Sequence, residues 1–221
     1  MFYFFKPPSK LTGYTKYKTN RDEKSNLPIP KQIKNLTIDP KIIEGDEISF
    51  TTNGEFIITE NALEILNENN ITNFCTRPVE KKDMGLFEFL KKEYPTKYFQ
   101  IICTSILEPL SEQTNIQRGK WPTSVLVSHD IHYYNKRVLE TSSDINQTQE
   151  YFGSEYGSPY FVQRHWIVSK KVRDIFINEF GQDEKFFTPV LIVDDFGNLV
   201  EPQKNEHKKC IHETESVVKS V

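Results

Sequence analysis

The chain has 221 residues, 37% of them hydrophobic and 27% charged, and its formal net charge is −3. This length is ample for a hydrophobic core, and the sixteen Phe and ten Tyr residues exclude a largely disordered chain. The weakly acidic balance gives no support to nucleic-acid binding, which normally comes with an excess of basic residues.

The distribution of apolar residues and cysteines indicates the compartment. No apolar run approaches the roughly 20 residues that a membrane-crossing helix needs, and the N-terminus lacks the order of a signal peptide. The three cysteines, Cys75, Cys103 and Cys210, are odd in number and have no metal-ligand spacing. We therefore expect a cytoplasmic protein without membrane contacts, in which Cys75 and Cys103 are small core residues.

The N-terminal part of the chain predicts strands and loops. Residues 2–5 are typical of a strand, which Pro7 and Pro8 end. Residues 9–40 are polar and predict loops with one or two short extended pieces. Residues 41–58 have strand composition, and an Asn-Gly pair within them predicts a hairpin turn between two strands.

A capped helix is predicted next, over residues 59–69. Thr59 can accept a hydrogen bond from an unpaired backbone N–H of the first turn, and the apolar residues that follow recur at helical spacing. A strand is predicted over residues 74–79. The pattern then indicates a second amphipathic helix over residues 83–94 and a buried strand over residues 98–107.

The second half of the chain repeats this alternation. Short strands are predicted over residues 124–127 and 131–139. Residues 140–158 are polar and acidic, and they lead into a strand over residues 161–168.

A second capped helix follows that strand. Ser169 is in the capping position, the helix is predicted over residues 170–180, and Gly181 is typical of a helix stop. A strand is predicted over residues 186–193. Residues 201–221 offer little to bury, so we expect them to form a flexible polar tail.

Residues 56–79 and 166–190 carry the same pattern. Each segment begins with an aromatic residue, two β-branched aliphatic residues and a hydroxyl residue that caps the helix, and each ends in a strand with a Pro-Val pair. A single unit of this kind cannot bury both its helix and its strand face, whereas two units can pack together. We therefore predict a single α+β domain over residues 1–200, with a mainly antiparallel sheet, about three packed helices and two similar strand–helix–strand units.

The repeated strand–helix–strand unit resembles a known protein family. The strand, the Ser or Thr cap, the helix with a buried Ile-Leu pair and the Pro-Val strand are similar to the immunity proteins of bacterial polymorphic toxin systems. The resemblance is best over residues 161–193 and weaker over residues 56–79. It implies a protein that neutralises a cognate toxin by binding it, without catalytic residues.

The histidines are the first candidates for chemistry. His129 and His132 lie three apart, but their flanks favour strands or a hairpin, and no third ligand is near in the sequence. Period 2 places His165 and Ile167 on the face opposite Trp166, which is typical of a packed, hydrogen-bonded histidine. An enzyme, namely a small metal-dependent hydrolase or nuclease that uses the three histidines, stays open as an alternative.

One stretch has the composition of a contact surface. Between residues 140 and 160 acidic residues alternate with tyrosines, and Lys and Arg are absent. Rigid aromatic side chains can anchor a basic partner while acids steer the encounter, although a loop whose aromatics turn into the core is also open. The predicted partner-binding residues are Glu140, Asp144, Glu150, Tyr151, Glu155, Tyr156 and Tyr160.

Together these features predict a non-catalytic immunity protein whose partner is a basic cognate toxin. No nucleic acid, membrane or cofactor is expected in its function. An adaptor or scaffold domain with another partner is the further alternative.

Overall fold

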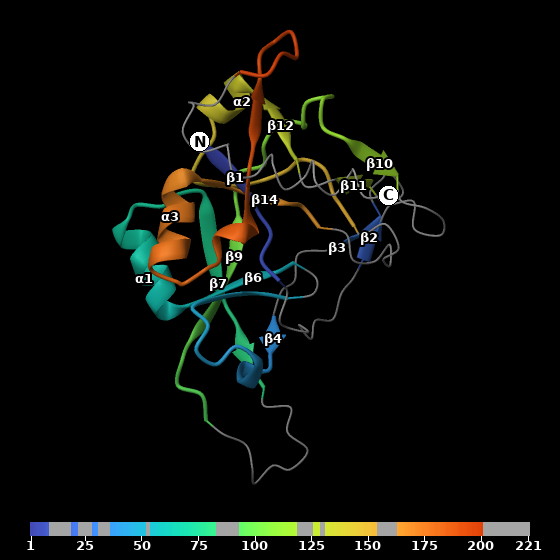
Figure 1. The fold of residues 1–221 in the computed structure, drawn as a ribbon. Coiled ribbons are helices and arrows are strands. Elements are labelled where there is room, and N and C mark those ends of the chain that lie inside the picture. The colour runs from blue at the N-terminus through green and yellow to red at the C-terminus, as the bar shows by residue number, and fades with distance from the viewer. Residues whose placement is uncertain are drawn as a thin grey trace, which may run out of the picture.

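The computed structural model describes residues 1–8, 19–21, 28–30, 36–51, 54–82, 93–118, 126–128, 131–153 and 163–200. Within them the chain has the predicted α+β fold, with mainly antiparallel strand pairs (Figure 1). The described residues form three α-helices, α1 (Glu60–Glu68), α2 (Lys136–Glu140) and α3 (Lys170–Asn178). No helix in these ranges has the length and apolar character that crossing a bilayer requires.

The first four-stranded sheet contains the strands that precede and follow α1 in the chain. Its strands are β5 (Ile48–Phe50), β6 (Phe56–Thr59), β9 (Tyr98–Cys103) and β7 (Phe74–Pro78), in that order. All neighbouring strands are antiparallel. The predicted hairpin between β5 and β6 is confirmed, and Gly54 in its turn has φ 83°, a value that favours glycine.

The second four-stranded sheet has the same plan. Its strands are β13 (Ile145–Gln147), β14 (Trp166–Ser169), β1 (Phe2–Phe5) and β15 (Phe187–Pro189), again in that order and all antiparallel to their neighbours. In both sheets the third strand lies between the strands that precede and follow the helix. In the first sheet this strand is β9, which follows the unit along the chain, whereas in the second it is β1, at the N-terminus.

The register shows how closely the two units correspond. Phe56 lies opposite Ile101, and Trp166 lies opposite Phe5. At the other end, Pro78 pairs with Phe99 and Pro189 with Tyr3. The residue after each proline donates its N–H to the residue that precedes the proline's partner, with N–O distances of 2.9 and 3.0 Å. The predicted pair of strand–helix–strand units is therefore confirmed.

Helices α1 and α3 begin with the same arrangement of hydrogen bonds. Thr59 accepts from the N–H of the third residue after it at 3.1 Å, and Ser169 does the same at 3.3 Å. Each capping hydroxyl also donates to an acid just before the first strand of its sheet. Ser169 Oγ donates to Asp144 Oδ1 at 2.7 Å, and Thr59 Oγ1 donates to Glu47 Oε2. The acids therefore orient the caps that satisfy the first-turn N–H groups.

The two units pack together around one central core. Helices α1 and α3 lie next to each other at the left of Figure 1, and the Lys171 ammonium donates to the carbonyl of Asn69 at the end of α1. The rings of Phe56 and Trp166 meet edge to face, with centroids 5.3 Å apart. The central core also contains Phe5, Ile58, Ala62, Leu66, Ile101, Val168, Val172, Ile175 and Phe176.

The outer face of each sheet carries a smaller core. Alternate residues of the strands point away from the central core, so Ile57 and Ile167 lie in different clusters. Ile57 packs with Leu36, Ile38 and Ile43. The second core, around Ile167, consists of Phe4, Leu107, Leu110, Tyr134, Val138, Leu139, Phe152 and Val190.

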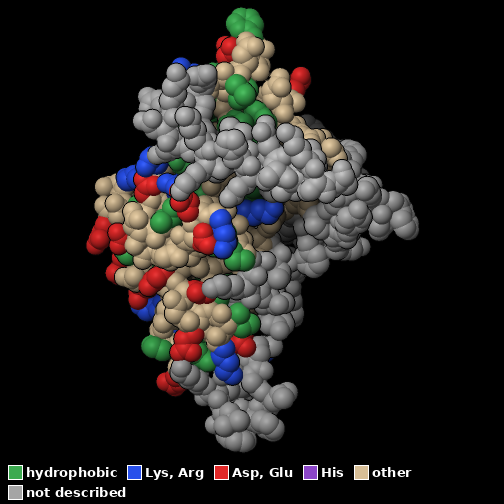
Figure 2. Space-filling view, viewed as in Figure 1, with side chains coloured by type: hydrophobic (Ala, Val, Ile, Leu, Met, Phe, Trp, Pro, Cys, Tyr) green, Lys and Arg blue, Asp and Glu red, His purple; other side chains and the backbone are tan. Residues whose placement is uncertain are grey.

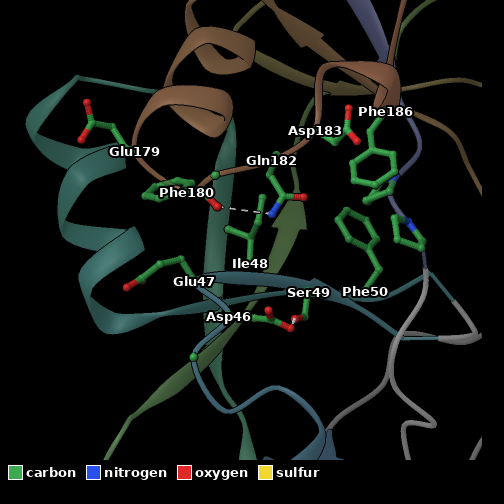
Figure 3. Close-up of a pocket in the computed structure, with 14 residues that line it drawn as sticks. Asp46, Glu47, Ile48, Ser49, Phe50, Glu179, Phe180, Gln182, Asp183 and Phe186 are labelled. Carbon is green, nitrogen blue, oxygen red and sulfur yellow. Dashed lines mark hydrogen bonds between the residues drawn. The ribbon is translucent and has the colours of Figure 1, made fainter.

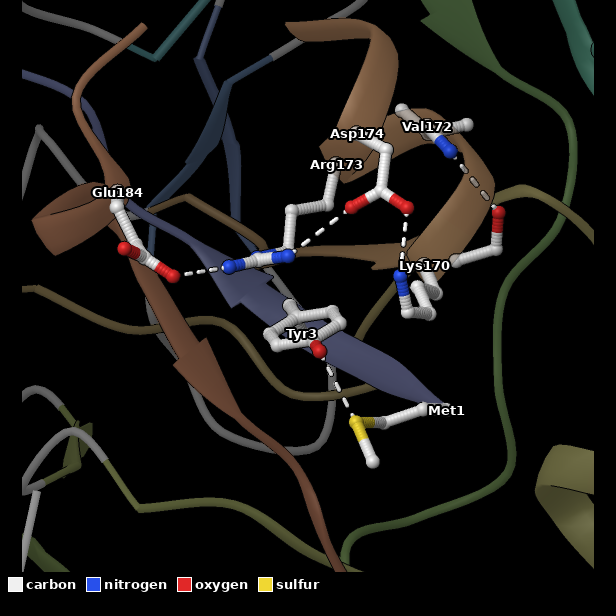
Figure 4. A network of polar contacts seen from close by, with 8 residues as sticks. Met1, Tyr3, Lys170, Val172, Arg173, Asp174 and Glu184 are labelled. Carbon is white, nitrogen blue, oxygen red and sulfur yellow. Dashed lines mark hydrogen bonds and ion pairs between the residues drawn. The ribbon is translucent and has the colours of Figure 1, made fainter. Parts of the chain in front are cut away.

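A polar network fastens the N-terminal strand to the second unit (Figure 4). The Arg173 guanidinium lies over the Tyr3 ring, 4.8 Å from its centroid, and donates to Asp174 at 3.0 Å and to Glu184. Lys170 donates to the other Asp174 oxygen at 2.7 Å. The Arg173 side chain is only 15% exposed, so these contacts hold β1 against α3 from inside the structure.

The remaining strands form short pairs. Two pairs are parallel, β4 (Thr37–Ile38) with β8 (Glu80–Lys81) and β12 (Tyr133–Asn135) with β16 (Leu191–Val193). Two are antiparallel, β2 (Thr19–Arg21) with β3 (Pro28–Pro30) and β10 (Ile116–Arg118) with β11 (Leu126–Ser128). The 3-10 helices within the described residues are η1 (Pro40–Ile42) and η3 (Glu184–Phe186).

Two predicted strands are wrong in part. The strand predicted over residues 131–139 ends at Asn135, whose side chain accepts from Arg137 N at 3.0 Å and caps α2. The strand predicted over residues 186–193 is two strands that pair with different partners, β15 with β1 and β16 with β12. In both regions the apolar pattern is too short to distinguish a strand from a capped turn of helix or a change of sheet.

The remaining predictions concern the cysteines and two segments that lie mainly outside the described residues. Cys75 is exposed, so its assignment to the core is wrong, because it lies on the edge strand β7. Cys103 is partly buried against the central core. The helix predicted over residues 83–94 and the tail predicted over residues 201–221 lie outside the described residues, except for residues 93–94, which are not helical.

Candidate functional site

The predicted contact segment is described as far as residue 153. Glu140 ends α2 and is exposed, and its carboxylate lies 3.5 Å from the Lys136 ammonium. Asp144 holds the cap of α3 and is thereby committed to the fold. Glu155, Tyr156 and Tyr160 lie outside the described residues, so the proposed contact surface stays a prediction there.

The next two predicted residues are held against the protein's own chain. Glu150 Oε1 accepts from Leu110 N at 2.9 Å. The Arg164 guanidinium lies over the Tyr151 ring, 4.3 Å from its centroid, and its Nη1 donates to the carbonyl of Thr148 at 2.6 Å. Both Glu150 and Tyr151 are only partly exposed. This half of the segment is therefore packed onto the fold, with limited surface left for a partner.

The structure brings two of the three candidate histidines together. His132 Nε2 and His165 Nδ1 are 2.9 Å apart, so one ring nitrogen donates and the other accepts. The His165 ring stacks between Phe4 and Phe152, with centroids 4.6 and 4.3 Å away. Burial lowers the pKa of His165 well below its ordinary 6.5, and the nearby charges of His132 and Lys6 lower it further.

This histidine pair belongs to the second core. His165 and Ile167 share a face, as the period of the strand predicts. His129 lies outside the described residues, and the described ones hold no group of three or more His, Cys, Asp or Glu side chains that could bind a metal ion. In the same region, burial raises the pKa of Tyr134 and the Glu150 carboxylate raises it further. The described geometry is that of a packed histidine pair in which burial disfavours the charged form of His165.

A cavity of about 340 Å³ lies elsewhere, between the start of β5 and the turn after α3 (Figure 3). We call it the acidic pocket. Its apolar wall includes Ile48, Phe50 and the aromatic rings of the α3 end, while the Gln182 side chain reaches into it above Ile48. Four acidic residues belong to its lining, and no Lys or Arg of the described chain does. The pocket is lined by Pro7, Pro8, Gly45, Asp46, Glu47, Ile48, Ser49, Phe50, Glu179, Phe180, Gly181, Gln182, Asp183 and Phe186.

The four carboxylates differ in their present contacts. Asp46 accepts from Ser49 Oγ at 3.3 Å, and Glu47 accepts from the cap of α1. Asp183 accepts from the Lys185 ammonium at 2.6 Å, and this bond lowers the pKa of Asp183. Glu179, at the end of α3, is exposed. In Figure 3 the carboxylates of Glu47 and Glu179 point away from the cavity, so the four acidic residues surround it without converging on it.

The sequence pattern did not single out the acidic residues of the pocket. Its two acidic pairs are more than 130 positions apart and meet only because the end of α3 lies against β5. Figure 2 shows acidic side chains over the side of the molecule that carries α1 and α3, with Lys and Arg side chains among them. A search for local acidic clusters cannot find a site that tertiary packing assembles.

The described residues define an α+β protein with a cavity between β5 and the turn after α3 that has aromatic and acidic residues in its lining. Comparisons with protein-family models, with curated proteins and with solved structures found no match.

Proposed function

We propose that the chain is an immunity protein, which binds a cognate bacterial toxin in the cytoplasm and neutralises it without catalysis. The observation that carries this proposal is the acidic pocket, a cavity whose described lining holds aromatic residues and four acidic residues and contains no Lys or Arg. Such a combination suits a basic protein partner, because aromatic walls supply contact area and acids give charge complementarity.

The roles of the other candidate side chains support binding over catalysis. Asp144 is committed to a helix cap, and the histidine pair is packed between two phenylalanines in the second core. The resemblance of the two strand–helix–strand units to toxin immunity proteins points the same way. A basic toxin would complement the acidic balance of the chain, whose net charge is −3.

Co-expression tests the proposal directly. The toxin encoded next to this chain's gene is induced in a sensitive host, with and without the protein, and growth and co-purification are measured. We expect the protein to restore growth and to form a complex that weakens as salt rises, since screening shortens the range of charge attraction. Continued toxicity together with the lack of a complex would contradict the proposal.

A variant that damages folding provides the control. Phe56 is fully buried in the central core, so Phe56→Asp places a charge there and is expected to abolish both rescue and complex formation. Phe196→Asp changes a side chain that is 90% exposed, and it should leave both unchanged. Equal rescue by both variants would show that growth does not depend on the folded protein.

A further inference from the structure

We propose that residues 148–153 and 163–165 form a strap that the His132–His165 pair fastens to the second core, and that this strap opens locally in acid while the rest of the fold stays intact. The two segments extend the β13–β14 strand pair beyond Gln147 and Trp166. The inference goes beyond the proposed function and does not depend on it, because it concerns only contacts within the chain.

Backbone hydrogen bonds hold the two segments of the strap together. Phe152 and Gln163 each donate an N–H to the other's carbonyl, with N–O distances of 2.8 Å. Thr148 donates its N–H to the carbonyl of His165, and its hydroxyl accepts from the N–H of His165, both at 3.0 Å. The Arg164 guanidinium also donates to the Thr148 carbonyl. Because they are joined to each other in this way, the two segments can move as one unit.

The contacts that fasten the strap centre on His165. Its ring lies between Phe4 of β1 and Phe152 of the strap, and its Nδ1 is 2.9 Å from His132 Nε2. His132 is fully buried and Phe152 is 2% exposed. Two further hydrogen bonds of 2.9 Å attach the strap, from Leu110 N to Glu150 Oε1 and from Gly153 N to Leu126 O. Among these contacts, the bond between the histidines is the one that needs a neutral ring nitrogen.

That requirement makes the fastening sensitive to acid. One of the two facing nitrogens must keep its lone pair to accept, so two protonated rings would bring two N–H donors and two positive charges 2.9 Å apart. Acid therefore replaces the hydrogen bond with repulsion. Burial disfavours the charged form of His165 and lowers its pKa in the closed strap, whereas an open strap exposes the ring to water and permits proton uptake.

The charged side chains around the pair do not compensate a positive charge on it. Lys6, just after β1, lowers the pKa of His165 further. The Arg164 guanidinium lies over the Tyr151 ring, and Glu150 already accepts from a backbone N–H. The titratable and charged groups on the elements packed against the pair are Lys6 beside β1, Tyr134 on β12, and Glu150, Tyr151 and Arg164 on the strap.

Two polar atoms near the pair also favour opening. Among the described residues, nothing pairs with the hydroxyl of Tyr134 or with Glu150 Oε2, and both atoms are buried. A buried polar group without a partner costs free energy that hydration restores. Opening would return the Glu150 carboxylate to water. Because the strap carries Glu150 and Tyr151, opening would also free this half of the predicted contact segment from the fold.

Hydrogen exchange of the full-length protein tests local opening. Exchange is followed by NMR at pH 7.5, 6.5 and 5.5 and corrected for the intrinsic rate of each amide. The amides of Phe152, Gln163 and His165 report the strap, and that of Phe176, fully buried in the central core, reports global unfolding. We expect the strap amides to be at least about hundredfold less protected than Phe176, and to lose about tenfold in protection from pH 7.5 to 5.5. Equal protection of strap and core, or strap protection that does not change with pH, would overturn the inference.

A double substitution assigns the pH dependence to the pair. Glutamine side chains donate and accept but take up no proton, so His132→Gln combined with His165→Gln should keep strap protection constant within about twofold over this pH range. Lys6→Gln removes a neighbouring charge and leaves the pair intact, so it should retain the change of about tenfold. A double variant that still shows the change would assign it to another group and contradict the inference.

The His165 ring itself gives a readout that needs no variant. In the parent protein its Cε1–H chemical shift should stay at the position of a neutral imidazole down to about pH 5.5, because the closed strap excludes the proton. Titration of this shift near pH 6.5, with the strap amides still protected, would show that the closed strap tolerates the charge and would refute the switch.

Discussion

Phe56 and Trp166 begin the second strand of their respective sheets, and their rings meet edge to face with centroids 5.3 Å apart. Equivalent positions of the two units are thus in direct contact at the centre of the molecule. Phe56 is fully buried and Trp166 is 6% exposed. Because each unit covers the face that the other leaves open, neither helix would bury its apolar stripe without the second unit.

Truncation of Trp166 is expected to destabilise the whole chain. Trp166→Ala should lower the free energy of unfolding by about 3–5 kcal/mol, the usual cost of emptying a large aromatic site in a core. Urea denaturation followed by circular dichroism measures the change. Phe196→Ala, at a side chain that is 90% exposed, should stay within about 0.5 kcal/mol of the parent. A Trp166→Ala loss of the same small size would mean that the two units do not depend on each other.

The two helix caps provide a second stability test. Thr59→Ala and Ser169→Ala each remove a side-chain acceptor for a first-turn N–H, and each should cost about 1 kcal/mol. Because the caps belong to different sheets, the double variant should show the sum within about 0.5 kcal/mol in urea denaturation. Asp144→Ala should cost less stability than Ser169→Ala. Asp144 only orients the Ser169 hydroxyl, whereas that hydroxyl itself accepts from the first-turn N–H. A larger loss for Asp144→Ala would contradict the assigned role.

The partly buried His165, packed between two phenylalanine rings, predicts a loss of stability in acid. Its pKa in the folded state is well below 6.5, whereas the unfolded chain takes up a proton near its ordinary value. The unfolded state therefore binds more protons below about pH 6.5, and stability falls there by up to about 1.4 kcal/mol per pH unit from this group. Above that pH the contribution is fully present.

Comparison with His165→Gln isolates this effect. Unfolding free energies of both proteins are measured between pH 7.5 and 5. The variant lacks one titrating group. The slope of its unfolding free energy against pH should therefore be smaller below pH 6.5, by an amount that corresponds to about one proton. The free energy of unfolding of the variant at pH 7.5 should be lower than that of the parent. The glutamine side chain has no ring to stack between Phe4 and Phe152. Parallel curves for the two proteins would show that His165 is not the neutral, packed group described.

The two described cysteines should differ in reactivity. Burial raises the pKa of the Cys103 thiol to about 11, so very little thiolate is present at pH 8, whereas Cys75 is exposed on an edge strand. Iodoacetamide at pH 8, followed by peptide mass spectrometry, should therefore modify Cys75 at least about tenfold faster than Cys103. Urea should remove the difference. Equal rates in the native protein would place Cys103 at the surface.

The local parts of the fold could be predicted because short-range patterns carry them. Thr59 and Ser169 cap helices as predicted, and Gly181, with φ 62°, follows the end of α3. The paired units were visible because cap, apolar stripe and Pro-Val strand recur in the same order. By contrast, the change at Asn135 from strand to helix was missed, since a helix of five residues leaves almost no periodic signal.

What the amino-acid sequence determined by itself was the two capped helices with their flanking strands and which face of each is apolar, because capping and periodicity act within a few residues. Only the tertiary structure decided that β1, at the N-terminus, completes the second sheet, and that His132 and His165 meet in a core. It alone also placed Glu47 near the turn after α3, where the acidic pocket forms. These relationships join residues far apart in the chain, and they follow from how two similar units bury each other's apolar faces.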